Sequence, residues 1–80
     1  MIIRAGTIIR VSDAKGGGFR AIVKEVESNA SGWHSDRNQR RIWFKRPGHG
    51  RQFMNATVTG PSEYTVWDSR FTVREIVRQP

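Results

Sequence analysis

Short runs of β-branched and aromatic residues, separated by Gly, Pro, Asn and Ser, make up most of this chain. Within several runs the apolar and polar positions alternate with a period of two, the spacing of a half-buried β-strand. No stretch of useful length shows the spacing of an amphipathic helix. The pattern therefore predicts an all-β protein. Strands are expected at residues 7–12, 19–27, 40–46, 51–59, 64–67 and 71–77, the last as a strand or as a short helical turn followed by a closing strand.

The alternation is cleanest in residues 40–46, where Ile42 and Phe44 are expected to face inward. Residues 51–59 follow after Pro47-Gly48-His49-Gly50, which is a strong turn signal. In residues 51–59 the inward positions are Met54, Ala56 and Val58.

A hairpin with these inward residues on one face has a defined register. Ile42 lies opposite Met54, Trp43 opposite Phe53, and Lys45 opposite Arg51, with an odd-length loop centred on Gly48. The outward face of the hairpin then carries Arg41, Trp43, Lys45, Arg51 and Phe53.

The run at residues 19–27 is less regular than the others. It places Phe19, Ala21 and Val23 on one face and Ile22 and Val26 on the other, which indicates a β-bulge or a strand with two covered faces. Glu25 and Glu27 share a face and are positioned to pair with basic neighbours.

A polar loop at about residues 28–39 follows, and loops of this length are often functional or disordered. Trp33 in this loop is either an anchor tucked into the core or an exposed contact residue. The pattern alone leaves both options open.

Five or six short antiparallel strands in 80 residues predict a single small β-barrel domain spanning residues 1–80, or a pair of packed sheets. The size, the meander and the long loop after the second strand resemble the SH3-like small barrels, including Tudor- and KOW-type modules. The resemblance is architectural, and the chain carries no motif specific to one of these families. An OB-like barrel is the alternative, although such barrels usually need more residues and often carry a helix.

Charge sharpens the functional expectation. The chain has 14 Lys and Arg against 7 Asp and Glu, a net charge of +7. Residues 33–53 contain six of the basic residues and one acid, Asp36, so this segment has a net charge of +5. Four aromatic residues are interleaved with them: Trp33, Trp43, Phe44 and Phe53. Clustered Arg with aromatic rings suits a polyanion that also offers flat faces, as nucleic acid does.

The sequence therefore predicts a small basic nucleic-acid-binding module of low sequence specificity. Its Arg and Lys side chains would neutralise phosphates, and Trp43 and Phe53 would stack on bases, at about 1–3 kcal/mol per base. DNA or RNA, single-stranded or duplex, remains open. The expected site consists of Arg37, Arg40, Arg41, Trp43, Lys45, Arg46, Arg51 and Phe53.

Other interpretations suit the same residues. Trp43 and Phe53 can simply stabilise the sheet as a cross-strand pair, with a solvated rim of cations around them. A protein-interaction adaptor would use the same face to bind an acidic protein partner, and a chain of this size suits a phage or bacterial accessory protein. Assembly into homo-oligomers through exposed strand edges is a third option.

Several kinds of chemistry are not expected. The chain has no cysteine, which excludes disulfides and thiolate metal sites. His34 and His49 match no metal-ligand spacing, and the triple glycine at 16–18 lacks the pattern of a phosphate-binding P-loop. The acids are scattered, so neither catalysis nor a cofactor is expected. No apolar run approaches the roughly 20 residues of a membrane span, and with no secretory signal we expect a cytoplasmic location.

Overall fold

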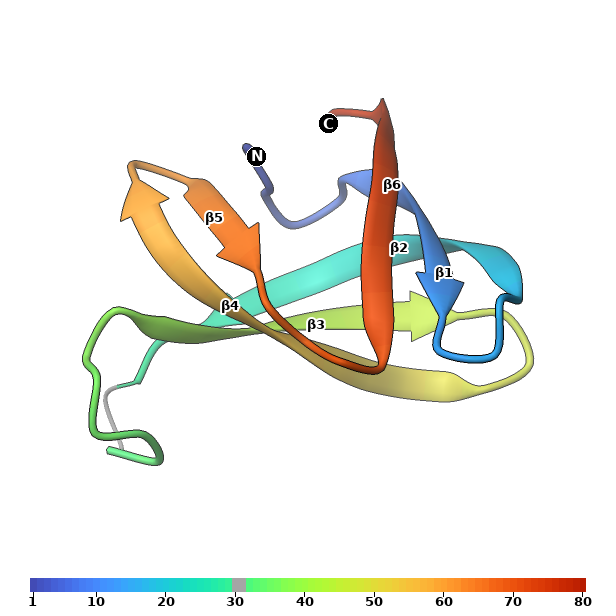
Figure 1. The fold of residues 1–80 in the computed structure, drawn as a ribbon. Coiled ribbons are helices and arrows are strands. Elements are labelled where there is room, and N and C mark those ends of the chain that lie inside the picture. The colour runs from blue at the N-terminus through green and yellow to red at the C-terminus, as the bar shows by residue number, and fades with distance from the viewer. Residues whose placement is uncertain (30–31) are drawn as a thin grey trace.

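The computed structural model describes residues 1–29 and 32–80. Within these ranges the chain forms one antiparallel sheet and no helix. The sheet order is β5-β4-β3-β2-β1-β6, so the chain meanders through five strands before β6 returns beside β1. The sheet curls into a nearly closed barrel (Figure 1). The strands are β1 (Ile8–Asp13), β2 (Gly18–Glu27), β3 (Gln39–Arg46), β4 (Gly50–Gly60), β5 (Glu63–Val66) and β6 (Phe71–Arg78).

The predicted all-β barrel is confirmed, and each strand lies within one residue of its predicted ends. Residues 71–77 belong to a strand along their whole length, so the helical-turn alternative for this segment was wrong. A meander of five strands with β6 returned beside β1 is consistent with a small SH3-like or OB-like barrel.

Inward positions from all parts of the sheet form one small core. Phe44 of β3 lies at its centre, with its ring centroid 6.0 Å from Phe19 of β2 and 5.3 Å from Phe71 of β6. Because β3 and β6 are not neighbours in the sheet, these rings join opposite walls of the barrel. The buried apolar side chains among the described residues are Ile3, Ile9, Val11, Ala21, Val23, Ile42, Phe44, Met54, Ala56 and Phe71.

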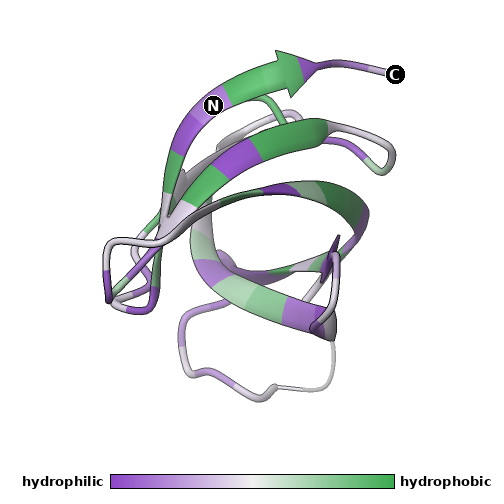
Figure 2. Cartoon of the chain, turned by 90° about the vertical axis from the view of Figure 1, so that its right-hand side faces the viewer, coloured by the Kyte–Doolittle hydropathy of each residue, from purple (hydrophilic) through white to green (hydrophobic). Residues whose placement is uncertain are grey.

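The β3–β4 hairpin has the register that its pattern predicts: Ile42 pairs with Met54, Trp43 with Phe53, and Lys45 with Arg51. The turn between them includes Gly48, whose φ of 79° lies in the left-handed region that glycine adopts without strain. Figure 2 shows the resulting alternation of hydrophobic and hydrophilic residues along the strands.

The irregularity in β2 is a β-bulge. The pairing of β2 with β3 shifts between Val23 and Glu25, which leaves Lys24 as the extra residue. Beyond the bulge, Glu25 pairs with Trp43, and Glu27 pairs with Arg41. The bulge therefore brings two carboxylates to the outer face of the hairpin.

The N-terminal residues close one end of the barrel. Ile2 forms a bridge with Glu63, and the backbone nitrogen of Tyr64 donates a 2.8 Å hydrogen bond to the Met1 carbonyl oxygen. The side-chain amide of Gln79 donates to the Ile2 carbonyl oxygen at 2.9 Å. The segment thus bridges the edge of β5 and the end of the chain beyond β6, and both termini lie at the same end of the barrel (Figure 1).

Replacement of Phe44 tests the role of the aromatic core. Phe44→Ala is expected to lower the free energy of unfolding by about 3–5 kcal/mol, because it leaves a cavity between two other rings. That is a large part of the roughly 5–15 kcal/mol that stabilises a typical domain. Urea unfolding followed by tryptophan fluorescence measures the change. Phe53→Ala, the same change on the outer face, is the control and should cost about 1 kcal/mol; equal losses would contradict the assignment.

Candidate nucleic-acid interface

Trp43 and Phe53 form a cross-strand pair on the outer face of the β3–β4 hairpin. Their ring centroids are 5.0 Å apart with the planes tilted by 54°, and both side chains are only partly buried. The rings therefore stabilise the sheet and at the same time offer part of their surface to solvent. We call these two residues the aromatic pair.

Guanidinium groups lie over the rings of this pair. Arg51 lies 4.9 Å from the Trp43 ring centroid, and Arg70 lies 4.9 Å from that of Phe53. Arg41 lies between two rings, 5.0 Å from Phe53 and 4.2 Å from Trp33. Stacked guanidinium groups gain cation–π stabilisation and keep N–H donors at their edges for anions.

Each stacked guanidinium also has a carboxylate partner. Arg51 pairs with Glu25, Arg41 lies 3.8 Å from Glu27, and Arg70 lies 2.8 Å from Asp68. Glu27 in addition accepts a 2.9 Å hydrogen bond from Nε1 of Trp43. Three cations minus three carboxylates leave the stacked cluster with no net formal charge. The pairing of Glu25 and Glu27 with basic neighbours, expected from their shared strand face, is confirmed.

The outer face of the hairpin brings together five of the predicted site residues. Arg41, Trp43, Lys45, Arg51 and Phe53 occupy outward positions of β3 and β4 in the expected register. Lys45 is exposed and has no carboxylate within 4 Å in the described part of the chain.

Arg46 is separated from this group. It has the strand parity of Ile42 and Phe44 and lies at the mouth of the barrel, where its guanidinium is 3.9 Å from the Phe19 ring centroid. It also lies 3.7 Å from Asp13, so it caps the core instead of extending the outer face.

Arg37 and Arg40 lie away from the aromatic pair. Arg40 is half-buried at the start of β3, and its Nη1 donates to the carbonyl oxygens of Arg37 and Gln39 at 2.6 and 2.8 Å. Arg37 is exposed in the preceding loop. The hydrogen bonds of Arg40 therefore hold the end of the loop that leads into β3.

The loop before β3 is organised by Asn29, which is 9% exposed. Its side-chain amide donates to the carbonyl oxygens of His34 and Asp36, at 2.6 and 3.1 Å, and its Oδ1 accepts from the His34 backbone nitrogen. Trp33 is half-buried and lies over Arg41 on the outer face, so it is not tucked into the core. The loop therefore covers one side of the candidate interface.

Asp68 and Arg70 are the site residues that sequence reasoning missed. The Asp68 side chain is 2% exposed and accepts 3.0 Å hydrogen bonds from the backbone nitrogen and Nδ2 of Asn55. Burial raises its pKa, but hydrogen bonds from Arg70 and from two backbone nitrogens outweigh this effect and lower the pKa to about 2. Hydrogen bonding to Asp68 in turn raises the pKa of Arg70. No local sequence signal connects these residues to Phe53, because the contact depends on how the connection between β5 and β6 crosses β4.

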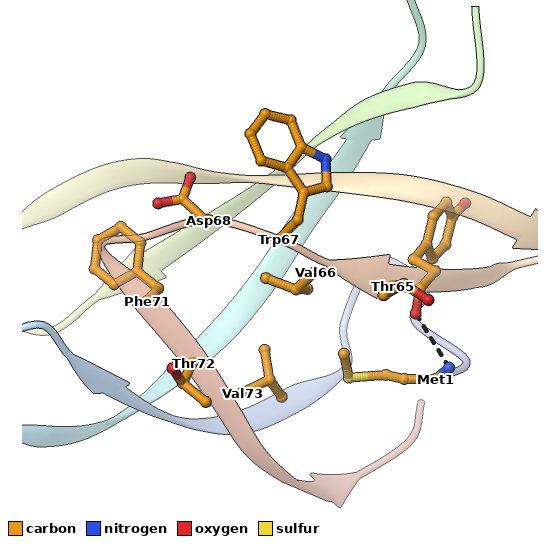
Figure 3. A pocket seen from close by; sticks show the side chains of 9 residues that line it. Met1, Thr65, Val66, Trp67, Asp68, Phe71, Thr72 and Val73 are labelled. Carbon is orange, nitrogen blue, oxygen red and sulfur yellow. Dashed lines mark hydrogen bonds between the residues drawn. The ribbon is translucent and has the colours of Figure 1, made fainter. Parts of the chain in front are cut away.

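A cavity of about 500 Å³ lies at the seam between β5 and β6. Figure 3 shows Met1, Val66 and Val73 around it, with the Trp67 ring pointing away from Val73. Its lining residues in the described part of the chain include no Lys or Arg. A cavity without cationic side chains does not suit a polyanion, so the seam is not part of the candidate interface.

Within residues 1–29 and 32–80, no group of three His, Asp or Glu side chains is placed to hold a metal ion. The same residues contain no helix long and apolar enough to cross a membrane. Comparison of the chain with protein-family models, curated proteins and solved structures gave no match.

The ion pair of Asp68 predicts a pH-dependent stability. Lowering the pKa from 3.8 to about 2 contributes about 2 kcal/mol of stability. Because the pKa is lower in the folded state, this contribution is present above about pH 4 and is lost as the pH falls through 2. Urea unfolding at pH 7, 5, 4, 3 and 2 measures it.

The other Asp and Glu side chains also titrate between pH 5 and pH 2, and the variant Asp68→Asn separates their contribution from that of Asp68. This variant should be less stable than the wild type at pH 7 and should lose less stability between pH 5 and pH 2. Parallel pH profiles for the two proteins would show that Asp68 does not carry the effect.

Proposed function

We propose that this protein is a nucleic-acid-binding module of low sequence specificity that uses the outer face of β3 and β4. The observation that carries the proposal is the partly exposed aromatic pair, Trp43 and Phe53, set among cations in a chain of net charge +7. Aromatic faces bind bases of any sequence by stacking, and nearby cations hold the phosphates. Since nucleic acid is an intracellular partner, a cytoplasmic location is part of the proposal.

The ion pairs of the face are compatible with this activity. Arg51 and Glu25 have half-exposed side chains, and an exposed ion pair contributes only about 0–1 kcal/mol. A phosphate oxygen can therefore compete with the carboxylate for the guanidinium at small cost. As the guanidinium moves to the phosphate, the face of Trp43 that it covers becomes available to a base.

Low sequence specificity follows because the outer face, in the residues that the structure describes, has no side chains arranged to read base edges. Reading a base edge requires rigid donors or acceptors aimed at it, usually as bidentate pairs. On this face the stacked Arg side chains already share their donors with carboxylates. Recognition would then come from stacking and phosphate contacts alone.

One observation favours a second function, the binding of an acidic protein partner. The stacked cluster has no net formal charge, and a face of rings and paired charges resembles a protein-contact surface as much as a polyanion site. A partner with acidic residues around an apolar side chain would complement Lys45 and the aromatic pair.

Alanine substitution of the aromatic pair tests the proposed function. Trp43→Ala and Phe53→Ala should each weaken binding to a fluorescein-labelled dT12 oligonucleotide about tenfold, which corresponds to roughly 1.4 kcal/mol of lost stacking. Fluorescence anisotropy at low and physiological salt gives the affinity, and tryptophan quenching reports the stacking directly.

Trp67→Ala is the matched control, because Trp67 is 49% exposed and lies outside the aromatic pair; thermal unfolding verifies that losing its hydrogen bond to Gln39 leaves the barrel intact. Its affinity should stay within twofold of the wild type. Failure of the wild type to bind DNA or RNA at low salt would overturn the proposal. If a labelled poly-glutamate peptide binds instead, the acidic-partner function holds.

A further inference from the structure

A second concave surface lies on the outer face beside the aromatic pair. It has a volume of about 520 Å³ and crosses β1, β2 and β3. We call it the β2 groove. Its lining residues are Ile8, Arg20, Ala21, Ile22, Lys24, Lys45 and Pro47.

The floor of the β2 groove is apolar and exposed. Ile22 is 42% exposed although it lies in mid-strand, and its cross-strand partner on β1 is Ile8. The outer face of a small barrel usually carries polar side chains at such positions. An exposed aliphatic floor inside a concavity is typical of a surface that is covered by a ligand.

The walls of the groove are cationic and lack carboxylate partners. Arg20, Lys24 and Lys45 surround Ile22, and none has a carboxylate within 4 Å in the described part of the chain. No Asp or Glu lines the groove. This distinguishes it from the aromatic pair, where each stacked guanidinium is neutralised.

Two pairs of like charges border the groove. Arg10 lies directly opposite Arg20, and Lys45 lies directly opposite Arg51. Like charges in cross-strand positions destabilise a sheet. In each pair one member has a carboxylate, since Arg10 lies 3.1 Å from Glu75 and Arg51 pairs with Glu25. Arg20 and Lys45 are the members of these pairs that have no carboxylate partner in the described part of the chain, so they are free to bind an anion.

The β2 groove is continuous with the aromatic pair. Ile8 pairs with Ile22, Ile22 with Lys45, and Lys45 with Arg51, which forms one outward row across four strands. The guanidinium of Arg51 at the end of this row lies over Trp43. A ligand that leaves the aromatic pair along this row enters the groove.

We infer that the β2 groove binds a single strand of nucleic acid, which passes from the aromatic pair across β2. This inference rests on the proposed function and adds to it the strandedness and the path of the ligand. In a single strand the bases are free to contact Ile8 and Ile22, while the phosphates reach the three cations. A duplex keeps its base faces stacked inside, so it leaves the apolar floor and the rings without a partner.

Two variants of the groove separate the contribution of its cations to binding from that of its apolar floor. Lys24→Gln should weaken dT12 binding about three- to tenfold at low salt and reduce the slope of log affinity against log salt by about 0.7, the value of one phosphate contact on a single strand. Ile22→Ser should weaken binding by a similar factor without changing that slope. Duplex DNA of the same length should bind more weakly than dT12 and should not respond to Ile22→Ser.

Matched controls make the same changes away from the groove. Lys15→Gln removes an exposed cation in the turn between β1 and β2, and Ile2→Ser changes an isoleucine that is 46% exposed. Both should stay within twofold of the wild type. Thermal unfolding of each variant verifies that the barrel is intact.

The possible failures are distinguishable. If the wild type binds dT12 and Trp43→Ala weakens it, but Lys24→Gln and Ile22→Ser behave like their controls, the path across β2 is wrong and the proposed function stands. Equal affinities for duplex DNA and dT12 would contradict the inference that the groove binds a single strand. If the groove variants lose binding of a poly-glutamate peptide but still bind dT12, the groove binds an acidic protein instead of nucleic acid. No oligonucleotide binding by the wild type would overturn both proposals.

Discussion

Closure of a very small core is the constraint on which the rest of this structure depends. Phe44 must meet Phe19 of the neighbouring strand and Phe71 from across the barrel, and only one parity of each strand places these rings inside. Because strand side chains alternate, fixing the inward residues also fixes the outward ones. The outward position of Trp43 is therefore a direct consequence of the burial of Phe44, its neighbour in the chain.

The cations on and beside the aromatic pair form two groups with different surroundings. Those stacked on the rings, such as Arg41 and Arg51, have carboxylate partners and help to hold the outer face together. Those around Ile22, namely Arg20, Lys24 and Lys45, have no such partner in the described residues. Beside the aromatic pair, cations without a carboxylate partner therefore lie in the β2 groove, whereas those on the rings are paired. Under the proposed function, a polyanion is attracted to the β2 groove and then stacks at its end.

Much of the fold could be predicted because local rules decide it. The turn at Gly48 and the alternation on both sides of it determine the β3–β4 register, which is why Arg41, Trp43, Lys45, Arg51 and Phe53 were placed together correctly. The same parity rule places Arg46 on the inner side. Arg46 was nevertheless predicted as a site residue, because it lies in the basic segment at residues 33–53. Proximity in sequence is a poor guide to a shared face in strands, since neighbours point in opposite directions.

What the sequence by itself determined is the set of strands, the register and two faces of the β3–β4 hairpin, and an irregularity in β2 that was either a bulge or a strand with two covered faces. All three follow from backbone geometry over a few residues, so a short window of sequence contains the information. Only the tertiary structure decided which distant side chains share the outer face. Arg70 reaches Phe53, and Arg20 joins Lys45, because the curvature and order of the strands bring them together. Such contacts depend on how the whole sheet closes, and no local pattern encodes that closure.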